Sequence, residues 1–229
     1  MNIEIIGGDS GFASALVHLN GGEQFISEAG AMYRCSANVD VDVTTRTRGK
    51  GGILSGLKRL LASEKFFFSS YRLDDGGSGE VGLAPTHQGQ VKQIDVTEAV
   101  PWYCSGGSYL GSGTGLEVDT EFQGWKGFLS GESLSFLKVS GTGPLLVGAF
   151  GRIVEIEVTD ELVVDTGHLV AFESTLQYTI SKASSSWLQS FLSGEGFVMK
   201  FRGRGRCWIQ SHNPTELGKT VGPHLPPRG

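Results

Sequence analysis

The sequence predicts an all-β protein in which one small β unit occurs three times, with short helices between strands. The pentapeptide FLSGE occurs at residues 128–132 and again at residues 191–195, each time a few residues after a tryptophan. Both copies precede an apolar run, a glycine-containing tip and a second apolar run, which is the pattern of a β-hairpin. Glycine accounts for 35 of 229 residues, about twice its usual share of roughly 7%. Because these glycines are spread as turn punctuation, many short strands joined by sharp turns are expected.

A third, weaker copy precedes these two. It reads GLKRLLASEKFFFSSYRLDDGGSGEVGLA, and its Glu64 stands 68 positions before Glu132, close to the 63 positions between the two pentapeptides. A period of about 60 to 70 residues is longer than that of common solenoid repeats, which favours three β modules in one compact body. We expect these pseudo-repeats near residues 16–93, 94–156 and 157–213, within a single body of residues 1–229.

The segment ahead of each copy predicts a turn followed by strands. EAGAMYRCSANVDVDV from Glu28, GGSYLGSGTGLEVDTEF from Gly106 and DTGHLVAFESTLQYTI from Asp165 all start at a turn of small residues. Each then continues with roughly period-two alternation, as an extended strand does. The predicted order within a module is therefore turn, strand pair, short helical turn and hairpin.

Short helices are expected just before two of the hairpins. Apolar residues recur at spacings of three and four over residues 53–61 and over residues 187–192, which marks one face of a helix. Helices this short need an apolar surface to lie on. Gly131 and Gly194 follow the helical pattern and are predicted to reverse the chain. Glu132 and Glu195 are interpreted as structural turn residues that begin the outgoing strands.

Composition favours a cytoplasmic protein with a flexible C-terminal end. The start MNIEIIGGDSG carries acids where a signal peptide needs basic and then apolar residues, and no apolar run reaches the length of a transmembrane segment. Three cysteines without C-x-x-C spacing indicate neither a disulfide framework nor a zinc site. They favour a reducing compartment and buried, inert thiols. Residues 214–229 are rich in proline and are expected to form a flexible tail.

Arginines at two predicted turns are the best binding candidates. Arg202, Arg204 and Arg206 alternate in KFRGRGRCW, and one strand would place them on one side as a stripe that holds phosphate or carboxylate groups. Arg46 and Arg48 alternate in the same way in TTRTRGKGG. The alternative is that these charges are solvated or pair with acids across strands. A formal net charge of −5 argues against nucleic acid as a general partner.

The sequence contains no recognisable catalytic or metal-binding pattern. The glycine-rich stretch at residues 106–115 lacks the G-K-[ST] ending of a phosphate loop, and a strand pattern follows it. Five scattered histidines include no H-x-H pair. Gly167 and His168 are interpreted as structural residues at a turn and a strand start. We therefore expect no catalytic residue, no metal site and no cofactor.

Four motifs of the chain resemble the AIM24 (DUF124) family and appear in that family's order. Gly22 and Glu23 match the G-E-x-hydrophobic opening, and residues 28–32 match an E-x-G-x-M segment. Residues 165–172 match a D-x-G-H segment, and residues 194–205 match a G-E-G pattern. The resemblance covers roughly residues 12–212. It implies a TRAP-like fold, similar to the tryptophan RNA-binding attenuation protein, in which a β-sandwich or double-stranded β-helix unit is repeated three times.

The resemblance implies no established activity, and the start of the chain favours a bacterial-type member. We expect a non-enzymatic protein that acts as an oligomeric scaffold or binding module, because unpaired β edges invite partners. The predicted assembly is a homo-oligomer, in particular a trimer. Two alternatives stay open. One is RNA binding through the basic hairpins, by analogy with the attenuation protein; the other is an enzyme whose pocket the sequence does not reveal.

Overall fold

The computed structural model describes residues 1–44, 67–74, 76–122, 135–182 and 197–226, and these residues are predominantly β, as predicted. The strands of this part of the chain are β1 (Asn2–Ile6), β2 (Ser14–Asn20), β3 (Gln24–Glu28), β4 (Met32–Cys35), β5 (Asp40–Thr44), β6 (Phe68–Arg72), β7 (Ser78–Leu83), β8 (Val91–Val96), β9 (Trp102–Ser105), β10 (Tyr109–Gly113), β11 (Leu116–Phe122), β12 (Ser135–Gly141), β13 (Gly143–Gly148), β14 (Ile153–Val158), β15 (Glu161–Asp165), β16 (Leu169–Glu173), β17 (Gln177–Lys182), β18 (Phe197–Arg202) and β19 (Gly205–Gln210). Two 3₁₀ turns, η1 (Gly8–Ser10) and η2 (Thr166–His168), connect strands.

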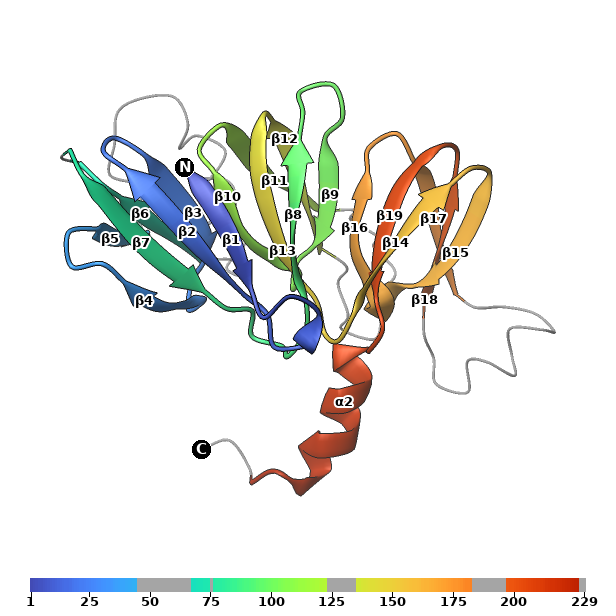
Figure 1. Cartoon of the computed structure of the whole chain (residues 1–229). Helices are drawn as coiled ribbons and strands as arrows, with labels where there is room; N and C mark the ends of the chain where they lie inside the picture. The colour runs from blue at the N-terminus through green and yellow to red at the C-terminus, as the bar shows by residue number, and fades with distance from the viewer. Residues whose placement is uncertain (45–66, 75, 123–134, 183–196, 227–229) are drawn as a thin grey trace.

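Within the described residues the strands form four antiparallel sheets. Their strand orders are β1-β2-β7-β4, β5-β6-β3-β10-β13-β8, β11-β12-β9-β16-β19-β14 and β15-β18-β17. The sheets follow one another across the body as a fan, and they converge toward the end that carries the C-terminal helix (Figure 1).

Three apolar cores lie between successive sheets. The N-terminal core joins the first and second sheets, the central core joins the second and third, and the C-terminal core joins the third and fourth. The two inner sheets contribute to a core on each side because successive side chains of a strand point to opposite faces. In β3, for example, Phe25 lies in the N-terminal core and the next residue, Ile26, lies in the central core. Strands covered on both faces carry near-continuous apolar runs, which explains segments such as LVAF in β16.

The strand order repeats with an increment of six. Adding six to each strand number in β2-β7-β4 produces β8-β13-β10, and adding six again produces β14-β19-β16. The triplets β5-β6-β3, β11-β12-β9 and β17-β18-β15 are related in the same way. The pairing register shifts at the same place in each set, after Met32 in β4, Tyr109 in β10 and Leu169 in β16.

The three segments compared in the sequence lie on corresponding strands. They form β4 with β5, β10 with β11, and β16 with β17. The segments predicted as hairpins form β6 and β7, β12 and β13, and β18 and β19. The hairpin prediction is wrong, because the two strands of each pair enter neighbouring sheets and do not pair with each other. The predicted helices at residues 53–61 and 187–192, and both FLSGE pentapeptides, lie outside the described residues.

The C-terminal segment, which the sequence predicts to be a flexible tail, contains a helix. In α2 (Pro214–Val221) the side-chain oxygen of Asn213 accepts the backbone N–H groups of Thr215 and Glu216. An Asn cap followed by Pro at the first position is a start signal for a helix, and the expectation from proline content overlooked it. A 3₁₀ turn, η3 (Gly222–His224), follows. Mobility of this segment stays a prediction. Among the described residues, no helix has the length and apolarity that crossing a membrane requires.

Candidate functional site

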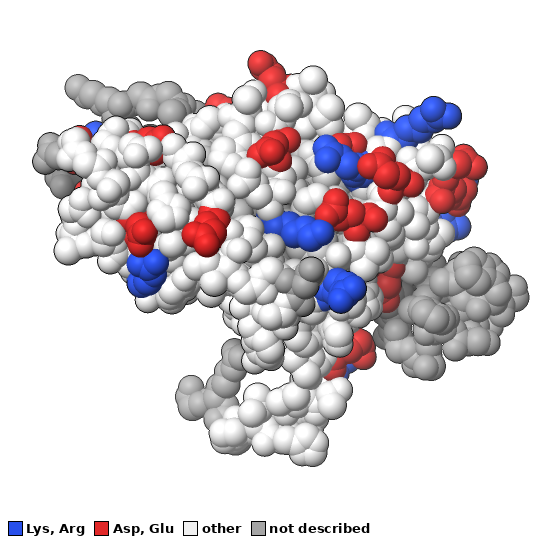
Figure 2. All heavy atoms as spheres, in the orientation of Figure 1, with Lys and Arg blue, Asp and Glu red and all other residues white. Residues whose placement is uncertain are grey.

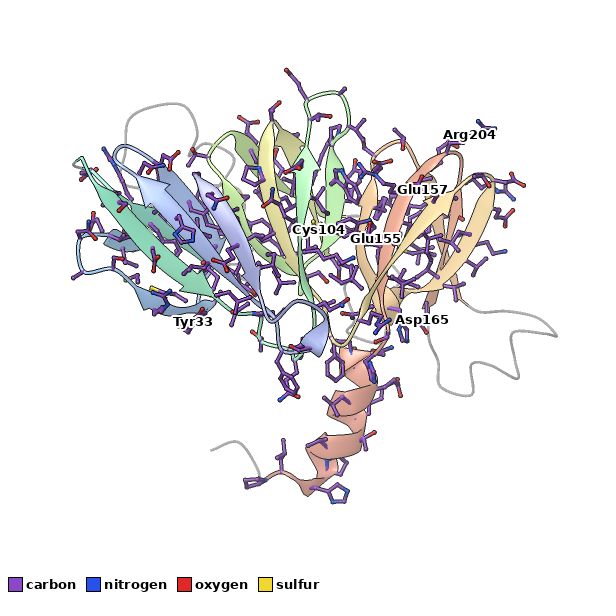
Figure 3. All side chains as sticks on the ribbon, viewed as in Figure 1. Tyr33, Cys104, Glu155, Glu157, Asp165 and Arg204 are labelled. Carbon is purple, nitrogen blue, oxygen red and sulfur yellow. The ribbon has the colours of Figure 1, made fainter. Side chains whose placement is uncertain are left out.

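The three arginines around the turn between β18 and β19 lie in different surroundings. Arg202 ends β18, and its Nη2 lies 3.4 Å from Oε2 of Glu161 on β15. Arg204 is exposed at the turn between the two strands, just after Gly203, whose φ of 114° helps to reverse the chain (Figure 3). Arg206 lies beyond the turn, on β19. Because the turn separates them onto two strands, these side chains do not form the single stripe that the sequence predicts.

Arg206 is held in an ion pair with a nearly buried acid. Its Nε lies 2.6 Å from Oε1 of Glu173, and its backbone N–H donates to Oε2 of the same carboxylate at 2.9 Å. Glu173 exposes only 8% of its surface. The guanidinium carbon also lies 4.9 Å from the centre of the Trp102 ring, in cation–π range. Since a buried carboxylate needs bonded partners, Arg206 compensates the charge of Glu173, which reduces the net positive charge that this position offers to a ligand anion.

Two tryptophans and a lysine extend this cluster. The rings of Trp102 and Trp208 meet edge to face with their centroids 5.5 Å apart. Lys92 of β8 lies 5.9 Å from the centre of the Trp208 ring, and its Nζ lies 2.5 Å from Oε1 of Glu155 on β14. Figure 2 shows basic and acidic side chains interspersed on this face of the molecule. The face is therefore balanced in charge and does not resemble an anion-binding patch.

A groove follows the outer edge of β8. One hollow of about 500 Å³ is lined by residues of β8, by Ile5 of β1 and by Trp208 of β19. A second hollow of about 430 Å³ continues it toward Met1, and both are lined by Gln93 and Asp95. β13 pairs with the other edge of β8, and no described strand pairs with β8 on the groove side. The groove therefore exposes a strand edge between two walls, β1 on one side and β14 with β19 on the other.

Gly167 and His168 stabilise the turn between β15 and β16. The carboxylate of Asp165 accepts the N–H of Gly167 at 2.8 Å, which caps η2. Nδ1 of His168 lies 2.8 Å from the backbone oxygen of Gln210, and the side-chain amide of Gln210 donates to the Gly167 carbonyl at 2.9 Å. A Cβ on Gly167 would lie 2.2 Å from the side-chain nitrogen of Asn213. These contacts join the turn to the end of β19 and to the start of α2.

The other predicted site residues lie outside the described residues; they are Arg46, Arg48, Gly131, Glu132, Gly194 and Glu195. Their binding and turn roles stay predictions. The glycine-rich stretch at residues 106–115, which lacks the ending of a phosphate loop, contains β10, and this strand is buried along its whole length. In the part of the chain that the structure describes, no three histidine, cysteine, aspartate or glutamate side chains are arranged to hold a metal ion.

The three cysteines differ in accessibility. Cys104 and Cys207 are buried, and burial raises the pKa of each thiol to about 12. Cys35, on β4, is only partly buried. The expectation of buried thiols therefore holds for two of the three, and Cys35 is the exception because β4 is an exposed edge strand.

The free energy of unfolding is expected to fall as the pH rises above 9. An unexposed thiol in the folded chain ionises near pH 12, whereas the ordinary thiol pKa is 9.0, so between these values the unfolded chain binds fewer protons than the folded one. Stability is then lost with rising pH, by up to about 1.4 kcal/mol per pH unit for each buried thiol. Urea unfolding at several pH values measures this slope. The variant with Cys104→Ala and Cys207→Ala should have a shallower slope. An unchanged slope would contradict the attribution of the pH dependence to these two thiols.

Sequence reasoning missed Glu173, Trp102, Asp95 and the groove. The one local signal for Glu173 is an acid that directly follows the apolar run LVAF. Its partner Arg206 lies 33 positions away, and no local pattern connects the two. The groove depends on where β1 lies beside β8, which is a property of the assembled sheets.

Comparisons with known proteins agree with one another. The family model described as "Mitochondrial biogenesis AIM24" matches residues 3–212. An uncharacterized protein of Streptococcus pyogenes serotype M6 is 27% identical over 214 residues, which cover 90% of this chain and 84% of that protein. The X-ray crystal structure of a Streptococcus pyogenes protein, a structural genomics target, is similar with a TM-score of 0.78 and 26% identity. That likeness covers 98% of this chain and 100% of the other.

Proposed function

Since the chain belongs to the AIM24 family, whose membership implies no activity, we propose that it is a non-enzymatic scaffold that assembles head to tail into a homo-oligomer. The assembling unit would be the whole chain, built from three copies of one TRAP-like β module. The copies would join through the unpaired outer edges of two strands, β4 in the first module and β15 in the third. The cytoplasmic location stays a prediction.

Three features support three copies of one module. The strand order repeats with an increment of six, and the register shift recurs in β4, β10 and β16. The spacing between corresponding strands is also constant. Nine residues separate the positions that correspond in the three modules, namely Ile26 and Cys35, Tyr103 and Ser112, and Val163 and Phe172. A constant spacing lets a residue in one module be assigned its counterpart in the next.

A contrast in exposure between corresponding strands carries the proposal. Neighbouring modules in the chain are joined by β3 pairing with β10 and by β9 pairing with β16. β10 and β16 are buried along their length, whereas their counterpart β4 exposes Met32, Tyr33 and Arg34. β15 corresponds to β3 and β9, and no described strand pairs with its outer edge. The outer edge of β4 thus lacks a partner equivalent to β3 or β9, and β15 is such a strand. The outer edge of β15 likewise lacks a partner equivalent to β10 or β16, and β4 is such a strand.

The exposed side chains at these edges are suited to burial. Tyr33 is 50% exposed and Val163 is 37% exposed. The counterparts of Val163 both reach into the core of the following module: Ile26 lies in the central core, and Tyr103 packs against the C-terminal core. By the same rule Val163 of one copy would enter the N-terminal core of the next copy, beside the partly buried Cys35.

The contact has to form between copies. β4 and β15 lie at opposite ends of the body (Figure 1), as Tyr33 and Asp165 do in Figure 3. A head-to-tail contact either closes into a ring or continues as a filament. The fan arrangement of the sheets turns each module relative to the last, which favours a ring, and a trimer is the assembly that we propose.

Val163→Cys tests this contact directly. Where modules join within the chain, Ile26 lies opposite Ser112 and Tyr103 lies opposite Phe172. Val163 corresponds to Ile26 and Tyr103, and Cys35 corresponds to Ser112 and Phe172, so Val163 would lie opposite Cys35 of the next copy. Facing Cα atoms of antiparallel strands are about 4.5–5.5 Å apart, within the range of a disulfide. Mild oxidation should therefore produce covalently linked chains on a non-reducing gel.

Two matched controls separate this contact from random oxidation. Adding Cys35→Ser to Val163→Cys should abolish the linked species. Val164→Cys should form none, because its side chain points to the opposite face and is 5% exposed. Absence of linked chains from Val163→Cys, together with a monomer by light scattering at high concentration, would rule the scaffold out.

The alternatives gain no support from the described contacts. Arg202 and Arg206 pair with Glu161 and Glu173, so their charge is offset for an RNA phosphate. For an enzyme, the groove along β8 contains Lys92, Asp95 and Glu155, and Lys92 is engaged in an ion pair with Glu155, so this alternative stays a prediction without a described contact that favours it. Filter binding of RNA at low salt remains the direct check on the first alternative.

A further inference from the structure

The corresponding strands β2, β8 and β14, one from each module, differ in what covers their outer edges. The outer edge of β2 is covered by β1, which pairs with it antiparallel from Asn2 opposite His18 to Ile6 opposite Ser14. The corresponding edge of β14 carries Glu155 and Glu157 (Figure 3). The corresponding edge of β8 faces the groove described above. The chain thus contains one example of a strand that binds this kind of edge.

Backbone groups of β8 point into the groove. Gln90, just before β8, accepts the N–H of Ala149 at 3.0 Å, whereas the N–H of Gly148 donates away from β8 to Ser108 at 2.8 Å. Hydrogen-bonding directions alternate along an antiparallel strand. The N–H and C=O groups of Gln93 and Asp95 therefore point away from β13 and toward the groove, where no described strand bonds to them.

We propose that this edge of β8 binds a short extended peptide of a partner protein, antiparallel to β8, as β1 binds β2. Ile94 of β8 pairs with Leu145 of β13 as Val17 of β2 pairs with Val81 of β7, so Ile94 corresponds to Val17. A peptide on β8 is therefore given the register that β1 has on β2. The first, third and fifth peptide residues then lie opposite Asp95, Gln93 and Val91. The second and fourth lie opposite Ile94 and Lys92.

The walls of the groove indicate the composition of the peptide. Residues opposite Ile94 and Lys92 share a face with Trp208, so the second and fourth peptide residues should be apolar. On the other face the Asp95 carboxylate accepts from the Gln93 amide at 2.6 Å and forms no ion pair with a described residue. Lys92 and Arg206 are already paired with acids. Because the unpaired charge is negative, basic residues should occupy the first and third peptide positions.

The walls also explain why a single peptide fits here better than another sheet. An open sheet edge is a template for aggregation, and proteins commonly recess or cover it. β8 is recessed between β1 and β14, so a broad sheet cannot reach it, while one strand can. Main-chain hydrogen bonds would supply affinity and the alternate side chains would supply specificity. The site lies at the edge of the second sheet, whereas β4 and β15 are edge strands of the first and fourth sheets, so it does not depend on the proposed assembly.

A blocked peptide of sequence Lys-Ile-Lys-Ile-Thr is the probe, and hydrogen exchange and fluorescence anisotropy are the measurements. Binding should slow exchange of the Gln93 and Asp95 amides. N-methylation of the third residue should weaken binding at least about tenfold, because its N–H faces β8. N-methylation of the second residue should have little effect, because its N–H faces solvent.

Protein variants test the charge preference on a folded background. Asp95→Lys should weaken the Lys-Ile-Lys-Ile-Thr peptide at least about tenfold and favour Glu-Ile-Glu-Ile-Thr instead. Equal affinities of the peptides that are N-methylated at the second and at the third residue would overturn the proposal. So would the absence of binding between the lysine peptide and the native chain. Protection of the Gln93 and Asp95 amides that appears with rising protein concentration alone would also overturn it, by assigning the edge to a second copy.

Discussion

Phe172→Ala is expected to lower the free energy of unfolding by about 3–5 kcal/mol, the usual cost of truncating a buried phenylalanine. Phe172 is fully buried in the C-terminal core. Its ring lies 5.1 Å from that of Tyr103, 5.2 Å from Tyr178 and 5.0 Å from Phe201, between centroids, and 5.8 Å from Phe136. Removing the ring leaves a cavity among groups held by two different sheets, which limits how far they can collapse.

Phe12→Ala is the matched control for this truncation. Phe12 is 71% exposed, so its loss should change the free energy of unfolding by no more than about 0.5 kcal/mol. Urea unfolding of both variants beside the native chain compares them. A cost below about 1.5 kcal/mol for Phe172→Ala would mean that this core is not packed as described.

Gly89→Ala is expected to destabilise the protein by at least about 3 kcal/mol, because it combines a backbone clash with lost hydrogen bonds. A Cβ at this position would lie 1.9 Å from the carbonyl oxygen of Ala149 and 2.6 Å from the backbone nitrogen of Gly151. The Gly89 carbonyl also accepts the N–H of Ala13 at 2.9 Å. These segments lead into β2, β8 and β14, so the substitution disturbs the entry to all three sets of strands.

Gly107→Ala is the control for the glycine effect. A Cβ on Gly107 would meet no atom within 4 Å, and its φ is not in the left-handed range. Its cost should therefore stay within about 0.5 kcal/mol. Thermal unfolding of the two variants is a sufficient comparison. Equal melting temperatures for Gly89→Ala and the native chain would show that the close approach at Gly89 relaxes without penalty.

Local sequence signals were sufficient for the β class and the family. Alternation in segments such as VDVDV and LEVDTEF, with glycine at the turns, predicts the strands because side-chain direction alternates along the backbone. The predicted AIM24 membership is confirmed by the match over residues 3–212. The same kind of reasoning was weaker at the C-terminus, where the capping signal of Asn213 outweighed the proline content.

Arg206 and Asp95 illustrate what local signals miss. Both sit in alternating strands, and nothing in their neighbourhoods tells them apart from solvated charges. Arg206 is neutralised by Glu173 of another strand, whereas Asp95 lines a groove formed with residues from distant parts of the chain. Such distinctions depend on pairings across tens of residues, and a local pattern carries no information on them.

The sequence by itself determined that this chain is a β protein of the AIM24 family, because strand propensity, turn chemistry and family motifs each depend on residues that are close together in the chain. Only the tertiary structure decided which arginines form ion pairs, which edges of the described strands stay unpaired and where a groove opens. Those properties arise when sheets from separate segments stack, since burial and hydrogen-bond satisfaction depend on neighbours that are remote in the chain.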